Sequence, residues 1–205
     1  MAVKIAVLGA TGMIGREIMN IMDERQFDAA EVHAIASRKS VGAEVSYGDR
    51  TLKAKDAENF DWGSVQLCIM AINDAAARKW ANKIAQAGCI VIDTSRAFRA
   101  DTQVPLVAPG VNPDAIEGYS KRNIIACPDG LTTQLAAVLK PIHDAAGVVR
   151  VVVATYQAVS GAGKRAMDEL WVQTKGIYVN QPPAPKEFPR QIAFNVIPQI
   201  EDFMD

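Results

Sequence analysis

The sequence has few of the residues that mark metal-binding or redox-active proteins, and it has no large excess of charge of one sign. Its 205 residues include three cysteines and two histidines. Cys68, Cys89 and Cys127 lie in or beside apolar runs without C-x-x-C spacing, so we expect buried reduced thiols and no metal site. Lys and Arg number 22 against 23 for Asp and Glu. This balance provides no global basic field for nucleic acid or an anionic membrane, so neither is expected as a partner.

Long apolar stretches are also missing. No run approaches the ~18 apolar residues of a membrane-spanning helix. The apolar run at residues 3–8 is short and ends at a glycine, which is unlike a signal peptide. We therefore expect a cytoplasmic protein with no membrane anchor. Hydrophobic residues make up 49% and charged residues 22% of the chain, a balance typical of a folded protein with a core.

The first part of the chain alternates short apolar runs with helical patterns. Val3 to Leu8 and Val32 to Ala36 predict strands, and helically spaced apolar residues at 14, 18, 21 and 22 connect them. Further buried strands are expected at residues 65–71, 89–93 and 123–126, with a helix at about 74–87. Apolar runs without alternation are typical of parallel sheets covered on both faces. Residues 1–128 are therefore predicted to form an α/β domain, a Rossmann-like, mostly parallel sheet.

The composition changes in residues 129–205, for which we predict part of a second, α+β domain. Helical spacing covers residues 131–146, where Pro141 is expected to kink or split the helix. The β-branched run Val148 to Val159 predicts a strand of a second sheet. A helix at residues 161–175, a proline-rich arm at 176–189 and a short strand at 192–197 are expected to follow.

A glycine-rich turn joins the first strand to the first helix. Gly9, Gly12 and Gly15 have the spacing G-x-x-G-x-x-G, and small residues there let a backbone approach a pyrophosphate at a helix N-terminus. This context predicts a dinucleotide site. The alternative is a tight turn without a ligand, because the spacing differs from the more specific G-x-G-x-x-G.

The end of the second strand distinguishes the two nicotinamide dinucleotides. NAD enzymes tend to place an acid there for the ribose 2′-hydroxyl, whereas this chain has Ser37, Arg38, Lys39 and Ser40. Hydroxyls and cations suit a 2′-phosphate, so NADP is the expected cofactor. The alternative is a solvated basic turn.

Several stretches together resemble one enzyme family. They are GATGMIG at 9–15, residues 37–42, DTSRAFR at 93–99, TYQAVSGAG at 155–163 and FNVIPQI at 194–200. Along its whole length the chain resembles aspartate-semialdehyde dehydrogenase. The resemblance implies an NADP-dependent oxidoreductase of the pathway to lysine, threonine, methionine and diaminopimelate. Such enzymes reductively dephosphorylate aspartyl phosphate to the semialdehyde through a cysteine thioester.

The resemblance also implies roles for individual residues. The pyrophosphate would be bound by Thr11, Gly12, Met13 and Ile14, the 2′-phosphate by Lys39 and Ser40, the nicotinamide side by Ser160 and Gly161, the acyl phosphate by Arg99 and the rest of the substrate by Gln157. A guanidinium suits bidentate phosphate contacts. The simpler interpretations are a surface cation for Arg99 and a polar residue at a strand end for Gln157.

The expected nucleophile is missing. The family places its cysteine at the start of a helix, in a segment that here reads Cys127-Pro128-Asp129-Gly130, and the matching position is Gly130. Without a thiolate no acyl-enzyme can form, and Asp129 would oppose an incoming acyl phosphate. Cys127 is an alternative nucleophile, but a buried structural thiol is the simpler interpretation.

Other catalytic groups of the family are expected in a region beyond these matched segments. The histidines present, His33 and His143, are expected to pack or cap, so we assign no catalytic residue. The resemblance thus implies a truncated, catalytically defective relative of the family. It would retain the NADP-binding domain at 1–128 and, at 129–205, an incomplete substrate-binding and dimerisation domain. One alternative is a non-enzymatic NADP-binding or dimerising protein that forms a homodimer or pairs with a full-length paralogue. Another is a fragment without independent function.

Overall fold

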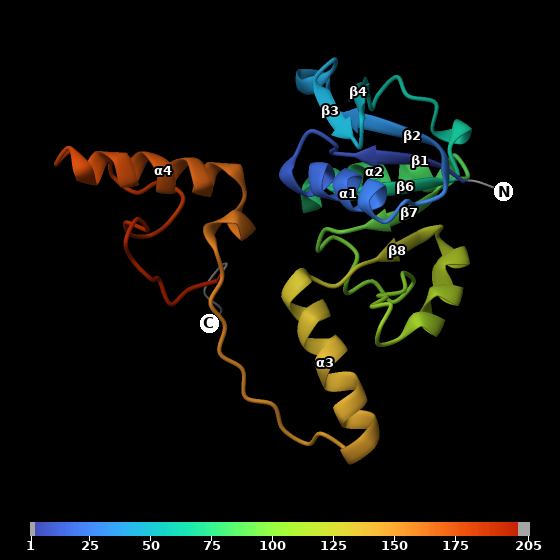
Figure 1. The fold of residues 1–205 in the computed structure, drawn as a ribbon. Helices are drawn as coiled ribbons and strands as arrows, with labels where there is room; N and C mark the ends of the chain where they lie inside the picture. The colour runs from blue at the N-terminus through green and yellow to red at the C-terminus, as the bar shows by residue number, and fades with distance from the viewer. Residues whose placement is uncertain (1–2, 201–205) are drawn as a thin grey trace. The chain divides into compact units, whose positions relative to one another are not determined.

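A computed structural model describes residues 3–200. The chain divides into two compact units, Met1–Val149 and Arg150–Asp205 (Figure 1). The domain boundary near residue 128 stays a prediction.

The first unit is built on a six-stranded sheet, in which every neighbouring pair of strands is parallel. In the order β5-β2-β1-β6-β7-β8, the strands are Lys55–Asp56, Ala29–Ala36, Val3–Leu8, Leu67–Met70, Ile90–Asp93 and Ile124–Ala126. The chain adds β2 and β5 on one side of β1 and then returns to place β6 on the other. This reversal confirms the Rossmann-like α/β class and creates a switch point at the carboxyl end of β1.

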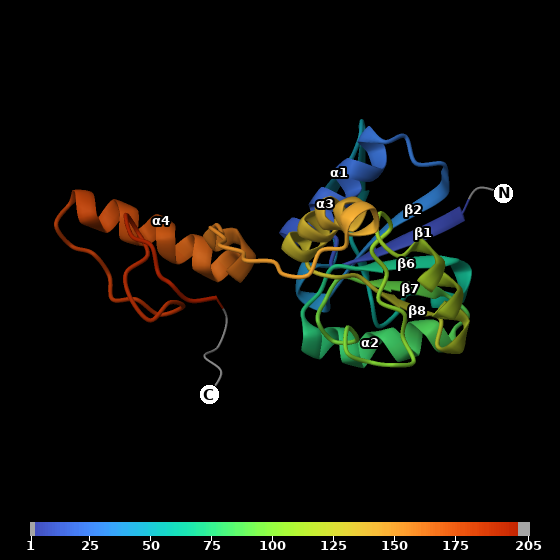
Figure 2. The same cartoon turned by 90° about the horizontal axis from the view of Figure 1, so that it is seen from below.

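Helices cover both faces of the sheet, as the unbroken apolar strands predict. Ile5 and Val7 of β1 pack in a cluster with Met19 of α1 (Met13–Glu24). Ala6 of β1, on the opposite face, packs in a second cluster with Trp80 of α2 (Asp74–Gln86). Figure 2 shows the sheet between α1 on one side and α2 on the other. The first cluster holds α1 against the sheet, and the second holds α2 against the opposite face.

A small hairpin, the two-residue strand β5 and three 3-10 helices complete the first unit, and sequence analysis missed them. The hairpin pairs β3 (Glu44–Tyr47) with β4 (Arg50–Lys53). Val45 and Tyr47 are buried in the cluster that α1 covers. The 3-10 helices are η1 (Arg38–Ser40), η2 (Trp62–Ser64) and η3 (Pro113–Lys121). Four-residue strands carry too little alternation to be recognised from sequence.

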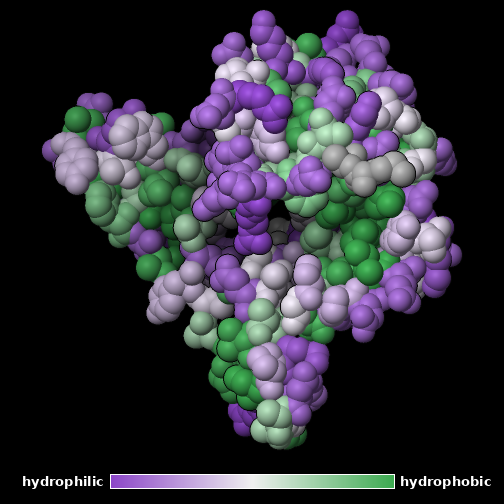
Figure 3. Space-filling view, turned by 45° about the vertical axis from the view of Figure 1, so that its right-hand side comes forward, coloured by the Kyte–Doolittle hydropathy of each residue, from purple (hydrophilic) through white to green (hydrophobic). Residues whose placement is uncertain are grey.

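Helix α3 (Gly130–Ala146) ends the first unit. It is continuous through Pro141, so the proline does not split it. None of its residues is buried, and Val138 is 61% exposed. Figure 3 shows hydrophobic and hydrophilic side chains on different sides of the part that protrudes at the lower end of the view, which α3 occupies in Figure 1. No helix within residues 3–200 has the length and apolar character needed to span a membrane.

In the second unit, the structure corrects two predicted strands. Residues 150–158 are extended without strand pairing, and residues 192–197 form a turn and coil. A β-strand is stable only when a partner satisfies its backbone N–H and C=O groups, and no described residue of this unit supplies one. The predicted helix is confirmed as α4 (Lys164–Tyr178), preceded by η4 (Val159–Ala162).

The proline-rich arm is tied to α4 by side chains of that helix. The carboxylate of Glu169 accepts hydrogen bonds from the N–H groups of Lys186 and Glu187 at 2.8 and 2.6 Å. The fully buried Gln173 accepts bonds from the N–H groups of Ile192 and Ala193 at 2.9 and 3.2 Å. These bonds hold the arm and the segment that follows it on α4 without a strand.

Candidate functional site

The glycine-rich turn lies at the switch point of the sheet, where close packing requires glycine. Gly9 has φ of +90°, and a Cβ atom there would lie 2.3 Å from the carbonyl oxygen of Ala71. A Cβ atom on Gly15 would lie 2.2 Å from the carbonyl oxygen of Gly9. The N–H of Gly9 donates to the carbonyl of Ile35 at 2.9 Å. The turn is therefore pressed against both neighbouring strands, and α1 starts directly from it.

The N-terminus of α1 is open, unlike those of the other two α-helices of this unit. Its N-cap residue is Gly12, no side chain caps it, and its first turn contains no acidic residue. Helix α2 is capped by Asn73 and helix α3 by Asp129. Free N–H groups and the helix dipole at such an end favour an anion. The exposed Met13 and Ile14 begin this helix, so the end is accessible and fits a pyrophosphate.

The loop after β2 lies beside the glycine-rich turn. The N–H groups of Gly9 and Ala10 both donate to the carbonyl of Ile35, which holds the ends of β1 and β2 together. Ser37 and Lys39 are exposed and Ser40 is half-buried. Gly42, with φ of +80°, then turns the chain toward the hairpin. The structure thus brings the predicted pyrophosphate and 2′-phosphate residues to the same edge of the sheet.

Arg16, a basic residue that sequence analysis missed, bridges this region. Its Nε donates to the carbonyl of Thr11 at 3.3 Å, and its Nη2 donates to the carbonyl of Glu44 at 3.2 Å. Thr11 belongs to the glycine-rich turn and Glu44 begins β3. The available signal was a cation in the first turn of the helix that follows such a motif.

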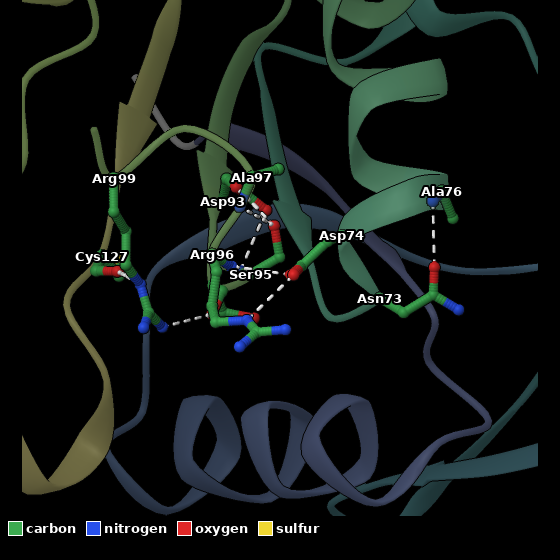
Figure 4. A network of polar contacts seen from close by, with 10 residues as sticks. Asn73, Asp74, Ala76, Asp93, Ser95, Arg96, Ala97, Arg99 and Cys127 are labelled. Atoms are coloured by element: carbon green, nitrogen blue, oxygen red, sulfur yellow. Dashed lines mark hydrogen bonds and ion pairs between the residues drawn. The ribbon is translucent and has the colours of Figure 1, made fainter. Parts of the chain in front are cut away.

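A polar network occupies the carboxyl ends of the neighbouring strands (Figure 4). The fully buried carboxylate of Asp93 accepts bonds from the N–H of Ser95 at 3.1 Å and from its hydroxyl at 2.7 Å. Burial raises the pKa of Asp93 above its ordinary value, although both bonds act against this shift. Arg96 donates from its N–H and Nε to Asp74 at 2.9 and 3.0 Å. The network fixes the loop that follows β7.

Arg99 is anchored at the same edge. Its Nε donates to the carbonyl of Cys127 at 2.9 Å and its Nη2 to the carbonyl of Thr94 at 3.2 Å. The side chain is half-buried, and its Nη1 has no hydrogen-bond partner within the described part of the chain. The loops after β7 and β8 therefore hold the guanidinium in place, and the N–H donors of Nη1 remain available. Its role toward a phosphate stays a prediction.

The start of α3 carries its own anion. The carboxylate of Asp129 accepts bonds from the N–H groups of Leu131 and Thr132 at 2.9 and 3.3 Å, and a short bond from the Thr132 hydroxyl. These bonds, that from the Thr132 side chain first, lower the pKa of Asp129. Gly130 is the first helical residue, and a Cβ atom there would meet nothing within 4 Å. The half-buried Cys127 has a pKa raised by burial, so its thiol is not activated.

The remaining predicted residues belong to the second unit. Gln157 is exposed in the extended segment, and Ser160 and Gly161 are exposed in η4. The N–H of Gly161 donates to the carbonyl of Ala158 at 3.3 Å. The assignment of these three residues stays a prediction.

A cavity of about 480 Å³ in the first unit lies elsewhere, and His33, Lys55 and Phe60 are among its lining residues. Lys4 and Glu31 near the starts of β1 and β2 also line it, so it opens at the edge opposite the glycine-rich turn. Lys55 Nζ lies 3.0 Å from His33 Nδ1, and burial lowers the pKa of His33. None of the predicted cofactor or substrate residues lines this cavity.

The comparison with known families assigns both parts of the chain to one family. Residues 4–119 match the family described as semialdehyde dehydrogenase, NAD binding domain, and residues 139–205 match its dimerisation domain. The chain belongs to the semialdehyde dehydrogenase family. The predicted resemblance is confirmed. Residues 4–119, which contain the glycine-rich turn, correspond to the family's NAD-binding domain.

Individual members of the semialdehyde dehydrogenase family support the same relationship. Aspartate-semialdehyde dehydrogenase of Shewanella violacea is 44% identical over 201 residues, which cover 98% of this chain and 60% of that relative. Aspartate-semialdehyde dehydrogenase 2 of Vibrio cholerae is 43% identical with the same coverages. The chain thus spans about 60% of the length of these curated relatives.

Solved structures give the same picture for the fold. The crystal structure of aspartate semialdehyde dehydrogenase II from Vibrio cholerae, complexed with ASA, has a TM-score of 0.96 and 42% identity. It is matched over 100% of this chain and 61% of that chain. A probable aspartate-semialdehyde dehydrogenase from Pseudomonas aeruginosa has a TM-score of 0.86 at 29% identity.

Proposed function

We propose that the first unit binds NADP and that the chain does not carry out the covalent step of its relatives. The observation that carries the cofactor proposal is the open N-terminus of α1, which starts from a turn where Gly9 and Gly15 leave no room for a side chain. Backbone N–H groups at such a position are suited to a pyrophosphate. The two cations after β2, and the absence of an acid in residues 37–40, favour a 2′-phosphate.

Each predicted residue has a distinct role in this proposal. The pyrophosphate is assigned to Gly9, Thr11, Gly12, Met13, Ile14 and Gly15, the 2′-phosphate to Ser37, Lys39 and Ser40, and the nicotinamide side to Ser160 and Gly161. When bound, NADP would supply a site for hydride transfer.

The substrate proposal rests on Arg99 and on the names of the relatives. The guanidinium of Arg99 is proposed to bind an acyl phosphate or aldehyde, the substrate class that the resemblance to aspartate-semialdehyde dehydrogenase implies. Gln157 is proposed separately for the rest of the substrate. Gly130 supplies no nucleophile at the start of α3, and the Asp129 carboxylate already occupies the N–H groups there. We therefore propose that the chain is catalytically defective while it retains binding groups.

The cofactor proposal is tested by calorimetric titration with NADP and with NAD. We expect saturable binding that is tighter for NADP, and a gain in stability of about 2.7 kcal/mol at one hundred times Kd. Lys39→Gln should weaken NADP binding about tenfold, since one charge-assisted bond to phosphate is lost. Lys53→Gln is the matched control, because it removes an exposed cation at the end of β4. Equal affinity for NADP and NAD, or no binding, would contradict the proposal.

A second proposed function is dimerisation through the second unit. Residues 139–205 match the dimerisation domain of the family, and Trp171, Tyr178 and Phe194 are 63%, 76% and 72% exposed. Exposed aromatic side chains of this size are typical of association surfaces. Light scattering should show a homodimer that Trp171→Asp weakens at least tenfold. A strictly monomeric wild type that also ignores a full-length paralogue would refute dimerisation.

A further inference from the structure

Arg16 lies between the two segments that the proposed cofactor site uses. It is the fourth residue of α1, and its N–H bonds to the carbonyl of Gly12 at 2.9 Å. The guanidinium reaches back to the carbonyl of Thr11 in the glycine-rich turn. It also reaches the carbonyl of Glu44, four residues beyond the loop that carries Lys39 and Ser40. One side chain thus joins the turn of β1 to the end of the loop after β2.

Most hydrogen-bonding capacity of this guanidinium is unused. Arginine has five N–H donors, and the two bonds at 3.3 and 3.2 Å engage only Nε and Nη2. Glu44 contributes its backbone carbonyl to this contact, so its carboxylate does not neutralise the charge there. Within residues 3–200, Arg16 has no ion-pair partner, and its side chain is exposed. A full positive charge with free Nη1 donors is therefore held in place by two backbone carbonyls.

We propose that Arg16 is a specificity-determining residue that binds the 2′-phosphate of NADP from the side of α1. The inference rests on the proposed function, because that function places the adenosine ribose between the glycine-rich turn and the Ser37 to Ser40 loop. A planar guanidinium binds a phosphate bidentately, and the two carbonyl contacts reduce the conformational entropy that it loses on binding. Together with Lys39 it matches the charge of a phosphate dianion, whereas the 2′-hydroxyl of NAD gains little from either cation.

The test compares dinucleotide selectivity in the full chain. We expect Arg16→Gln to raise the Kd of NADP about ten- to a hundredfold, the range for one or two charge-assisted bonds. The Kd of NAD should stay unchanged. Arg25→Gln is the matched control, because it removes an exposed cation at the other end of the same helix. It should leave the ratio of the two Kd values at the wild-type level.

The other outcomes separate this inference from the function on which it rests. If wild type binds NADP and NAD equally or not at all, the proposed function and this inference both fail. If wild type prefers NADP and Arg16→Gln keeps that preference, only the inference fails. An equal loss for both dinucleotides would show that Arg16 merely clamps the turn to the hairpin, which also overturns it. Should Arg16→Gln not fold, Arg16→Lys decides, since an unchanged Kd ratio in that variant refutes bidentate binding.

Discussion

Gly9→Ala is expected to lower the free energy of unfolding of the first unit by about 3 to 5 kcal/mol. The new Cβ atom would lie 2.3 Å from the carbonyl oxygen of Ala71. This carbonyl cannot move away easily, because the N–H of Ala71 is bonded to Leu8 at 2.8 Å. The φ angle of +90° adds strain for any residue with a side chain. NADP binding should be lost with the shape of the turn.

Gly88→Ala separates the two causes of this destabilisation. Gly88 has nearly the same φ of +89°, but a Cβ atom there meets nothing within 4 Å. The control should therefore lose only the conformational part, about 1 to 2 kcal/mol. Urea unfolding in a Trp171→Phe background would report the first unit through the buried Trp62 and Trp80. An equal loss of unfolding free energy in the two variants would show that the contact between a Cβ atom at position 9 and the carbonyl oxygen of Ala71 is unimportant.

The wild-type chain is expected to show no phosphate-dependent oxidation of aspartate semialdehyde with NADP, and Gly130→Cys is expected to restore little. The introduced side chain has open space around it, so a folding defect should not obscure the result. Turnover should stay below about 0.01 per second, against ~10 per second for a typical enzyme. Of the histidines, His33 lines the cavity at the opposite edge. His143 lies about 20 Å further along α3.

Asp129 gives a second reason for low activity in Gly130→Cys. Its carboxylate accepts hydrogen bonds from the N–H groups of Leu131 and Thr132. Without this carboxylate, the same N–H groups would stabilise a thiolate at the start of the helix. Adding Asp129→Asn should lower the pKa of the introduced thiol by about one unit or more, because a negative charge leaves the helix end. The pH dependence of alkylation by iodoacetamide measures this pKa, with wild type as the control for Cys127.

Two results would contradict this account of the missing chemistry. Substantial turnover by the wild-type chain would show that another group replaces the cysteine. Substantial turnover by Gly130→Cys alone would show that the other catalytic groups are present. If Asp129→Asn leaves the pKa of the introduced thiol unchanged, the carboxylate does not affect the stability of a thiolate at the start of the helix.

The strands β1, β2, β6, β7 and β8 and the α-helices of the first unit were predictable because their signals are local. The apolar run Val3 to Leu8, the glycines after it and the helical spacing up to Met22 lie within a short stretch of sequence. A strand–helix–strand motif has few alternative arrangements, because the connection between its two parallel strands is almost always right-handed. The strand predicted at 148–159 was wrong because its formation depends on a distant pairing partner and not on a local signal. Its β-branched residues favour extension, but only a pairing partner makes an extended segment a strand.

The sequence alone determined that position 130 is a glycine, which has no nucleophilic side chain. It also determined that the glycine-rich turn lies directly before a helix. It also placed Ser37 to Ser40 after a strand. Only the tertiary structure decided which helix end is open to an anion, because Gly12 leaves α1 uncapped whereas Asp129 caps α3. It also decided the roles open to Arg16 and Arg99. Their guanidinium groups are oriented by carbonyls 28 residues away, at Glu44 and Cys127, and such long-range bonds leave no periodic signal in a sequence.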